Sequence, residues 1–161
     1  MALAQKKFRE FVFQLLFSKN FLKEDNDLDL DEDEKLIDDQ LIEMFMIKFK
    51  ITKKSVYKAL NFVKKMVPYQ SEIDQMIQKK STEYDFKRIS LVELNILRLG
   101  VFELFFDKGD IENDKPLDHK IVIAECIRIC KKYSTTSSIT FVNAVLDALI
   151  KNNENIPVAA N

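Results

Sequence analysis

The segment ISLVELNILRLGVFELFFD, residues 89–107, decides the fold of this 161-residue chain. Its polar members do not share one helical face: Glu93, Asn95, Arg98 and Glu103. A helix that is apolar on almost every side is usually surrounded by other helices. The charges of such a helix need partners, because an unpaired buried charge is strongly destabilising. We therefore predict that residues 89–107 form the central helix of a bundle.

The composition of the chain extends this prediction to an all-α fold. Hydrophobic residues make up 47% of the chain, which contains two Gly and three Pro. So few helix breakers favour long helices with short connections, and no strand alternation of useful length is present. Helical periodicity predicts a first helix near the start and six more at 34–49, 53–67, 69–81, 89–107, 119–133 and 137–151.

Several residues have the chemistry of helix ends. Thr52 and Asp118 are suited to cap the helices that follow them. Pro68 ends the helix before it. Residues 23–35, KEDNDLDLDEDEK, are predicted to form an acidic loop, and residues 152–161 a frayed C-terminal tail.

Basic and acidic residues are unevenly distributed along the chain, although the net charge is only −1. Residues 1–22 carry Lys6, Lys7, Arg9 and Lys19 against Glu10 alone. Residues 23–39 carry ten acids against two lysines. A basic segment beside an acidic loop suggests a polyanion site with a repulsive neighbour, and an ordinary solvated helix and loop is the alternative.

The first helix is predicted to have two different faces. One face is apolar and holds Ala4, Phe8, Phe11, Val12, Leu15 and Leu16. The other combines charges with aromatics: Lys6, Arg9, Glu10, Phe13 and Phe17. RNA-binding proteins use cations for phosphates and aromatics for stacking bases. The alternative is that Phe13 and Phe17 pack under another helix while the cations remain in water.

The chain lacks the motifs of common catalytic and cofactor sites. Its two glycines are too far apart for a phosphate-binding loop. In a calcium loop starting at Asp25, Leu30 and Leu36 would replace the required Gly and Glu. No run is apolar and long enough to span a membrane, and the charged N-terminal segment does not fit a signal peptide, so we expect a cytoplasmic protein. We predict no catalytic residues and no cofactor.

The only histidine and the two cysteines raise the question of a zinc site. His119, Cys126 and Cys130 share one helical face. Two turns separate His119 from Cys126, roughly 10 Å along a straight helix, and a fourth ligand is missing. We predict two small buried thiols and no metal site.

Four segments, in order and with fitting spacing, resemble the family of the bacterial transcription antitermination factor NusB. They are QKKFREFVFQLLFS at 5–18, VELNILRLGVFEL at 92–104, the Lys-x-x-Ile-x-Glu-x-Ile-x-x-x-Lys pattern within 120–133, and FVN with VLD within 141–147. The chain departs from the family pattern at Ser134, where Gly is frequent, and at Ala144, where FVNG becomes FVNA.

The resemblance implies a NusB-like helical bundle of two packed helical subdomains, with a single RNA-binding domain over 1–151. It implies binding to boxA-type single-stranded RNA in nascent ribosomal RNA. It also implies a partnership with NusE, which is ribosomal protein S10, and through it an indirect link to the RNA polymerase elongation complex. The free protein would be a monomer or a homodimer.

The resemblance and the residue pattern together nominate the binding residues. The RNA-binding candidates are Lys6, Lys7, Arg9, Tyr133, Ser137, Thr140, Phe141 and Asn143. Thr136, Thr140, Asn143 and Asp147 fall on one helical stripe, which is either a polar edge for RNA or a plain solvent stripe. Phe141 is either a core residue or a stacking platform. Glu93 is the candidate contact to NusE, and pairing within the bundle is its alternative.

Two other functions fit an all-helical chain of this length. One is a non-catalytic protein-interaction module without RNA affinity. The other is a stand-alone relative of the RNA-binding domain of ribosomal RNA cytosine methyltransferases. The methyltransferase itself would need a further Gly-rich cofactor domain.

Overall fold

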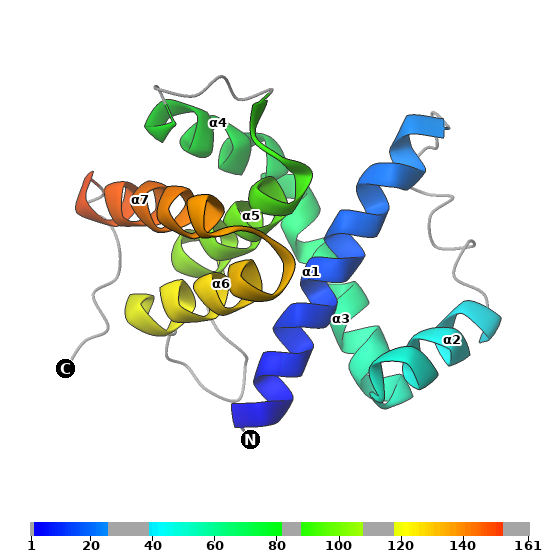
Figure 1. Ribbon diagram of the computed structural model, residues 1–161. Coiled ribbons are helices and arrows are strands. Elements are labelled where there is room, and N and C mark those ends of the chain that lie inside the picture. Colours follow the sequence, from blue (N-terminus) through cyan, green and yellow to red (C-terminus); the bar gives the residue numbers. More distant parts are fainter. Residues whose placement is uncertain (1, 26–38, 82–87, 108–117, 153–161) are drawn as a thin grey trace. The chain divides into compact units, whose positions relative to one another are not determined.

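The computed structural model describes residues 2–25, 39–81, 88–107 and 118–152, and these residues are helical with short connections and no strand. The all-α prediction is therefore confirmed, with seven α-helices and one short 3₁₀ helix in this part of the chain. The chain divides into two compact units, residues 1–65 and 66–161 (Figure 1). The first unit holds α1 (Ala2–Asp25), α2 (Asp39–Phe49) and nearly all of α3 (Lys53–Met66). The second holds η1 (Val67–Tyr69), α4 (Gln70–Lys80), α5 (Leu91–Phe105), α6 (His119–Tyr133) and α7 (Thr136–Asn152).

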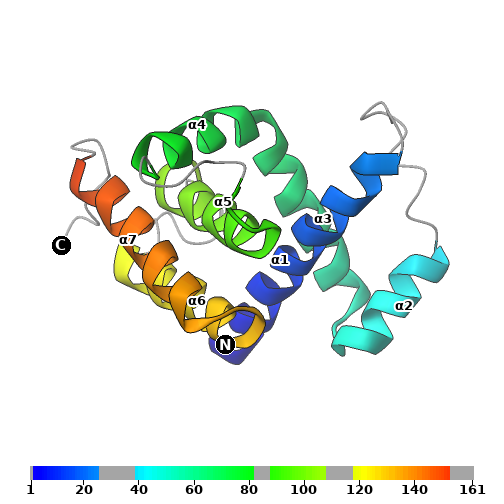
Figure 2. The same cartoon turned by 45° about the horizontal axis from the view of Figure 1, so that its top comes forward.

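Aromatic side chains join the three helices of the first unit. The ring centroid of Phe11 on α1 lies 5.4 Å from that of Phe45 and 5.0 Å from that of Phe49, both on α2. Phe8 meets Phe62 of α3 edge to face, with 6.0 Å between the centroids. Figure 2 shows α1 lying across α3. Such aromatic pairs stabilise packing beyond the area that they bury.

Two residues of the predicted charged and aromatic face of the first helix, Arg9 and Phe13, are buried. For Arg9 the prediction of an exposed cation is wrong, whereas the burial of Phe13 agrees with the alternative that its ring packs inside the fold. Phe11, Val12 and Phe13 are all buried, and successive helical residues lie about 100° apart, so burial extends around more than half of α1. The helix also continues to Asp25, so the acidic loop does not begin at residue 23. The rest of that loop lies outside the described residues.

A tight turn joins α2 to α3. Lys50 has a positive φ of 52°, and the Ile51 N–H donates to the Met46 carbonyl at 3.2 Å. This is the bonding pattern of a helix end whose C′ residue is left-handed, a position usually held by glycine. Thr52 then caps α3, because its hydroxyl accepts from the Ser55 N–H at 3.2 Å. The cap predicted at Thr52 is confirmed.

Helix α5 is the centre of the second unit, as predicted. It packs against α4, α6 and α7. It begins two residues later than predicted, because the Ser90 hydroxyl caps it by accepting from the Glu93 N–H. At Gly100 a Cβ atom would lie 2.8 Å from Cys126 Sγ, so only glycine permits this close approach of α5 to α6.

The remaining helix ends agree with the prediction to within about two residues, except that the predicted start of the second helix, residue 34, lies outside the described residues. Asp118 caps α6 by accepting from the Lys120 N–H at 3.0 Å. Helix α3 ends at Met66, and Pro68 lies in the 3₁₀ turn that leads into α4. Asn152 still belongs to α7, and the predicted tail beyond it lies outside the described residues. No described helix combines the length and apolarity needed to cross a bilayer.

Candidate functional site

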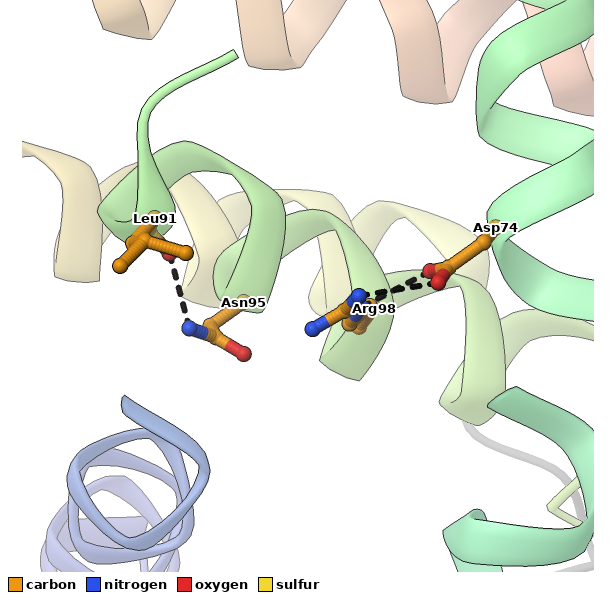
Figure 3. Close-up of polar contacts among 4 residues, drawn as sticks. All are labelled: Asp74, Leu91, Asn95 and Arg98. Carbon is orange, nitrogen blue, oxygen red and sulfur yellow. Dashed lines mark hydrogen bonds and ion pairs between the residues drawn. The ribbon is translucent and has the colours of Figure 1, made fainter. Parts of the chain in front are cut away.

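The charged residue in the middle of α5 is paired within the second unit. Arg98 Nε lies 2.8 Å from Asp74 Oδ1, and a second guanidinium nitrogen lies 2.9 Å from Asp74 Oδ2 (Figure 3). The Arg98 side chain is only 11% exposed and that of Asp74 24%. A two-pronged pair of this kind fixes orientation as well as charge. The pair joins α5 to α4 and gives the nearly buried Arg98 charge the partner that it needs to be stable there.

Asn95 is fully buried one turn earlier on the same helix. Its amide nitrogen donates to the Leu91 carbonyl at 2.8 Å, as Figure 3 shows. Its Oδ1 atom is the one buried side-chain oxygen or nitrogen without a hydrogen bond among the described residues. The amide therefore holds the first turn of α5 locally and makes no bond to another helix.

Glu93, the candidate contact to NusE, has a partner inside the second unit. Its carboxylate accepts a hydrogen bond from the Ser138 hydroxyl at the start of α7, and Ser138 is buried. Burial, and to a smaller extent the negative charge of Glu93, raise the pKa of Cys130 near the end of α6 to about 11. Glu93 thus lies where α5, α6 and α7 meet. The pairing named as its alternative exists, and a NusE contact stays a prediction.

The predicted polar stripe on α7 faces solvent. Thr136, Thr140 and Asn143 are exposed and Asp147, the fourth residue of the stripe, is half-buried, whereas Val145 and Leu149, on the opposite side, are buried. The geometry of the stripe is therefore confirmed, while its use for RNA stays a prediction.

Residues in and next to the stripe differ in exposure and in their partners. Ser137 is exposed, and Phe141 is half-buried, so part of its ring remains accessible. Asp147 makes an exposed ion pair with Lys151 at 2.9 Å. The Thr135 hydroxyl accepts from the Ser138 N–H at 3.4 Å and so begins the helix.

Tyr133 ends α6 beside two lysines that the sequence argument did not nominate. Lys131 and Lys132 are exposed, and Lys132 Nζ lies 5.6 Å from the centroid of the half-buried Tyr133 ring. The KKY triplet immediately before the hydroxyl-rich turn was the signal that could have identified them. Cations beside an aromatic ring next to polar residues form a surface suited to RNA.

The first unit carries the remaining RNA candidates. Lys6 and Lys7 are exposed at the start of α1, as an RNA contact requires. Arg9 is buried, so it does not extend the exposed cations of this helix. The nominated RNA residues are thus divided between the units: Lys6, Lys7 and Arg9 in the first, and Tyr133, Ser137, Thr140, Phe141 and Asn143 in the second.

The two cysteines are buried thiols, as predicted. Cys126 and Cys130 are both free, and Cys126 Sγ approaches the Ile96 carbonyl oxygen at 3.9 Å. His119 lies in the first turn of α6, where Nδ1 is 3.5 Å from an Asp118 carboxylate oxygen. Within the described ranges, no three His, Cys, Asp or Glu side chains are grouped as metal ligands.

Comparison with known proteins places these features in one family. The model of the NusB family matches residues 6–151. The transcription antitermination protein NusB of Chlamydia pneumoniae is 30% identical over 143 residues, covering 89% of this chain and 78% of that protein. The NusB of a Nitratiruptor species is 40% identical over 106 residues, covering 66% of this chain and 70% of that protein.

Solved structures of similar fold point to the same family. T. maritima NusB has a TM-score of 0.68 and 29% identity, covering 92% of this chain and 91% of that chain. A chain in a crystal structure of the antitermination factors NusB and NusE with double-stranded RNA has a TM-score of 0.67 and 27% identity. That match covers 95% of this chain and 100% of the other.

Proposed function

Because this chain belongs to the NusB family of transcription antitermination proteins, we propose that it binds boxA-type RNA of nascent ribosomal transcripts together with NusE. The complex would hold the transcript near the elongating RNA polymerase and so support processive transcription in the cytoplasm. The protein would act by binding alone, without a catalytic step or a cofactor.

The observation that carries the proposal is the exposed polar edge at the start of α7. Thr136, Ser137, Thr140 and Asn143 present hydroxyl and amide groups without a carboxylate among them. These groups can donate hydrogen bonds to phosphates and base edges, and the N-terminal end of a helix favours anions. The first acidic residue of α7 is Asp147, where Lys151 balances its charge. RNA can therefore approach this end of α7 without repulsion from α7 itself.

The RNA partner is further supported by a related complex. The similar structure that contains NusB and NusE also contains double-stranded RNA. For this chain, a single-stranded boxA element is favoured by the accessible part of the Phe141 ring and by Tyr133, because unpaired bases can stack on aromatic side chains.

A gel-shift titration with boxA-like RNA, with and without NusE, tests the proposal. We expect specific binding that tightens when NusE is present. Lys6→Ala with Lys7→Ala should reduce the slope of log affinity against log salt by roughly 1.4, since each phosphate contact on single-stranded RNA contributes about 0.7. A protein-interaction module would bind NusE and ignore RNA. A relative of the methyltransferase RNA-binding domain would bind RNA with no gain from NusE.

The contact between Glu93 and NusE requires a pair of variants. Glu93→Lys reverses the charge facing a basic ribosomal protein, but it also removes the acceptor of Ser138. Ser138→Ala removes only the internal hydrogen bond and leaves the Glu93 carboxylate in place. If Glu93 binds NusE, Glu93→Lys should weaken the complex and Ser138→Ala should not, both measured where the variants are fully folded. Equal losses would assign Glu93 to the fold alone.

A further inference from the structure

The α2–α3 segment of the first unit carries an unbroken basic surface. Between Glu43 and Glu72 the sequence has no acidic residue. In the same interval it has seven lysines, all of them exposed: Lys48, Lys50, Lys53, Lys54, Lys58, Lys64 and Lys65. This is a denser set of exposed cations than Lys6 and Lys7 provide at the start of α1. Such a run of exposed lysines attracts polyanions, and no carboxylate within this interval of the sequence opposes it.

Most of these lysines lie on one face of α3. The buried residues of this helix are Val56, Ala59, Val63 and Met66. The exposed residues recur at the complementary positions: Lys53, Lys54, Tyr57, Lys58, Asn61, Lys64 and Lys65. At 1.5 Å per residue this face, here named the α3 lysine face, is about 18 Å long. It is long enough to follow several phosphates of an extended strand.

An aromatic ring stands within the α3 lysine face. Tyr57 is 45% exposed, and Lys53 Nζ lies 6.0 Å from its ring centroid. An exposed tyrosine between lysines offers a flat surface to a base while its neighbours contact the phosphates.

The α3 lysine face lies beside the start of α1. Lys58 Nζ lies 5.6 Å from the ring centroid of Phe8. Phe8 directly follows the exposed Lys6 and Lys7 and packs against Phe62 of α3. Within the first unit, the exposed lysines at the start of α1 and those of α3 are therefore carried by two helices in contact.

We propose that the α3 lysine face is a second RNA contact surface, which binds the single-stranded transcript that flanks the boxA element. The inference rests on the proposed function, because it takes the ligand to be the same transcript. The lysines would neutralise phosphates, and Tyr57 would stack on a base. An anionic membrane is a poorer fit, because an interfacial helix needs a free apolar face and that of α3 is buried in the fold.

The decisive experiment compares two RNAs and two charge-matched variants in the presence of NusE. One RNA carries boxA alone, and the other adds an unstructured extension long enough to span α3. The test variant is Lys53→Gln, Lys54→Gln and Lys65→Gln. The control removes as many exposed cations from the second unit: Lys79→Gln, Arg88→Gln and Lys120→Gln.

On the extended RNA the test variant should lose about 2.1 from the salt slope, and the control variant almost nothing. On boxA alone, the two variants should bind equally. Equal slopes on the extended RNA would overturn the inference, as would a test variant that loses binding to phosphatidylserine vesicles but keeps the RNA slope. If the wild type fails to prefer boxA over a scrambled element, the proposed function fails, and the slopes on the extended RNA still decide the role of α3.

Tyr57 gives a second readout that does not depend on charge. Tyr57→Phe keeps the ring and should bind the extended RNA within a factor of about two of the wild type, since stacking needs only the aromatic face. Tyr57→Leu should weaken that binding at least about fivefold, which corresponds to the lower end of base–aromatic stacking. Equal affinities for the Phe and Leu variants would remove the stacking contact from the proposal.

Discussion

The lysines of α2 and α3 in the first unit differ in exposure from the ionic residues of α5 in the second. In the first unit the lysines of α2 and α3 are exposed over an apolar interior held together by aromatic rings. In the second unit the ionic residues of α5 are turned inward. Arg98 pairs with Asp74, and Glu93 accepts from the buried Ser138. Charged side chains are thus exposed to solvent on α2 and α3 of the first unit, whereas those of α5 connect helices in the second.

This difference distinguishes residues of the family motifs that hold the fold together from residues that are exposed and suited to binding. The segment VELNILRLGVFEL contains both Glu93 and Arg98, and each of them holds a neighbouring helix. Residues with the chemistry of RNA binding are instead exposed on α1, α3 and α7. A family motif in this chain can therefore mark a residue that preserves the fold. Substitutions in the two units should accordingly affect different measurements.

The largest effect on stability is expected at Arg98. Arg98→Ala leaves Asp74 without its two-pronged partner in a largely buried position, so unfolding free energy should fall by about 3 kcal/mol. Urea denaturation followed by circular dichroism measures this loss. The double replacement Arg98→Met with Asp74→Leu should recover much of it, because no unpaired charge remains. A single variant as stable as the wild type would show that the charges of α5 are not structural.

The sequence predicted the helices well because their end signals are local. Thr52 and Asp118 each accept from a backbone N–H a few residues later, so their caps can be found without knowing the fold. The partners of Arg98 and Glu93 could not be found in this way. Asp74 lies 24 positions from Arg98, and Ser138 lies 45 positions from Glu93. Only the packing of α4, α5 and α7 brings these residues together.

The candidate site was predicted less completely, for the same physical reason. The hydroxyl-rich stripe of α7 follows from helical spacing, and its exposure agrees with that pattern. The burial of Arg9 and Phe13 depends on how much of α1 is covered, which no periodicity of α1 alone reveals. The lysines of α3 are plain in the sequence, but they lie outside both the basic chain start and the family motifs that nominated the RNA candidates.

A smaller loss of stability is expected at the hydrogen bond between Ser138 and Glu93. Ser138→Ala removes a buried donor to a carboxylate and should cost about 2 kcal/mol in unfolding free energy. Ser137→Ala, one residue away on the exposed side of α7, should change it by less than about 0.5 kcal/mol. Thermal or urea unfolding distinguishes the two variants. Equal stabilities would mean that water replaces Ser138 at no cost.

The next effect is smaller and depends on pH. The pKa of Cys130 is raised from 9.0 to about 11 by burial and by the Glu93 charge. Between these values the unfolded thiol ionises while the folded thiol stays protonated, so stability is complete below pH 9 and declines toward pH 11. At pH 10 the loss should be about 1.4 kcal/mol relative to pH 7. Cys130→Ala has no thiol to ionise, so the difference in unfolding free energy between wild type and variant should shrink by about 1.4 kcal/mol from pH 7 to pH 10. A difference that stays constant with pH would contradict the prediction.

The smallest expected effect is at Lys50, where one substitution should change both the stability of the protein and its RNA binding. Lys50 holds a left-handed conformation, with φ of 52°, that glycine adopts without steric cost. Lys50→Gly should therefore stabilise the protein by about 1 kcal/mol in urea unfolding. The same change removes one exposed cation beside the α3 lysine face, so the salt slope for the extended RNA should fall by about 0.7. Lys50→Asn serves as a control, because Asn removes the charge and tolerates the left-handed region while keeping a side chain. It should match the Gly variant in RNA binding and gain less stability. A Gly variant that gains stability without any loss of RNA binding would exclude Lys50 from the RNA surface and confine that surface to α3.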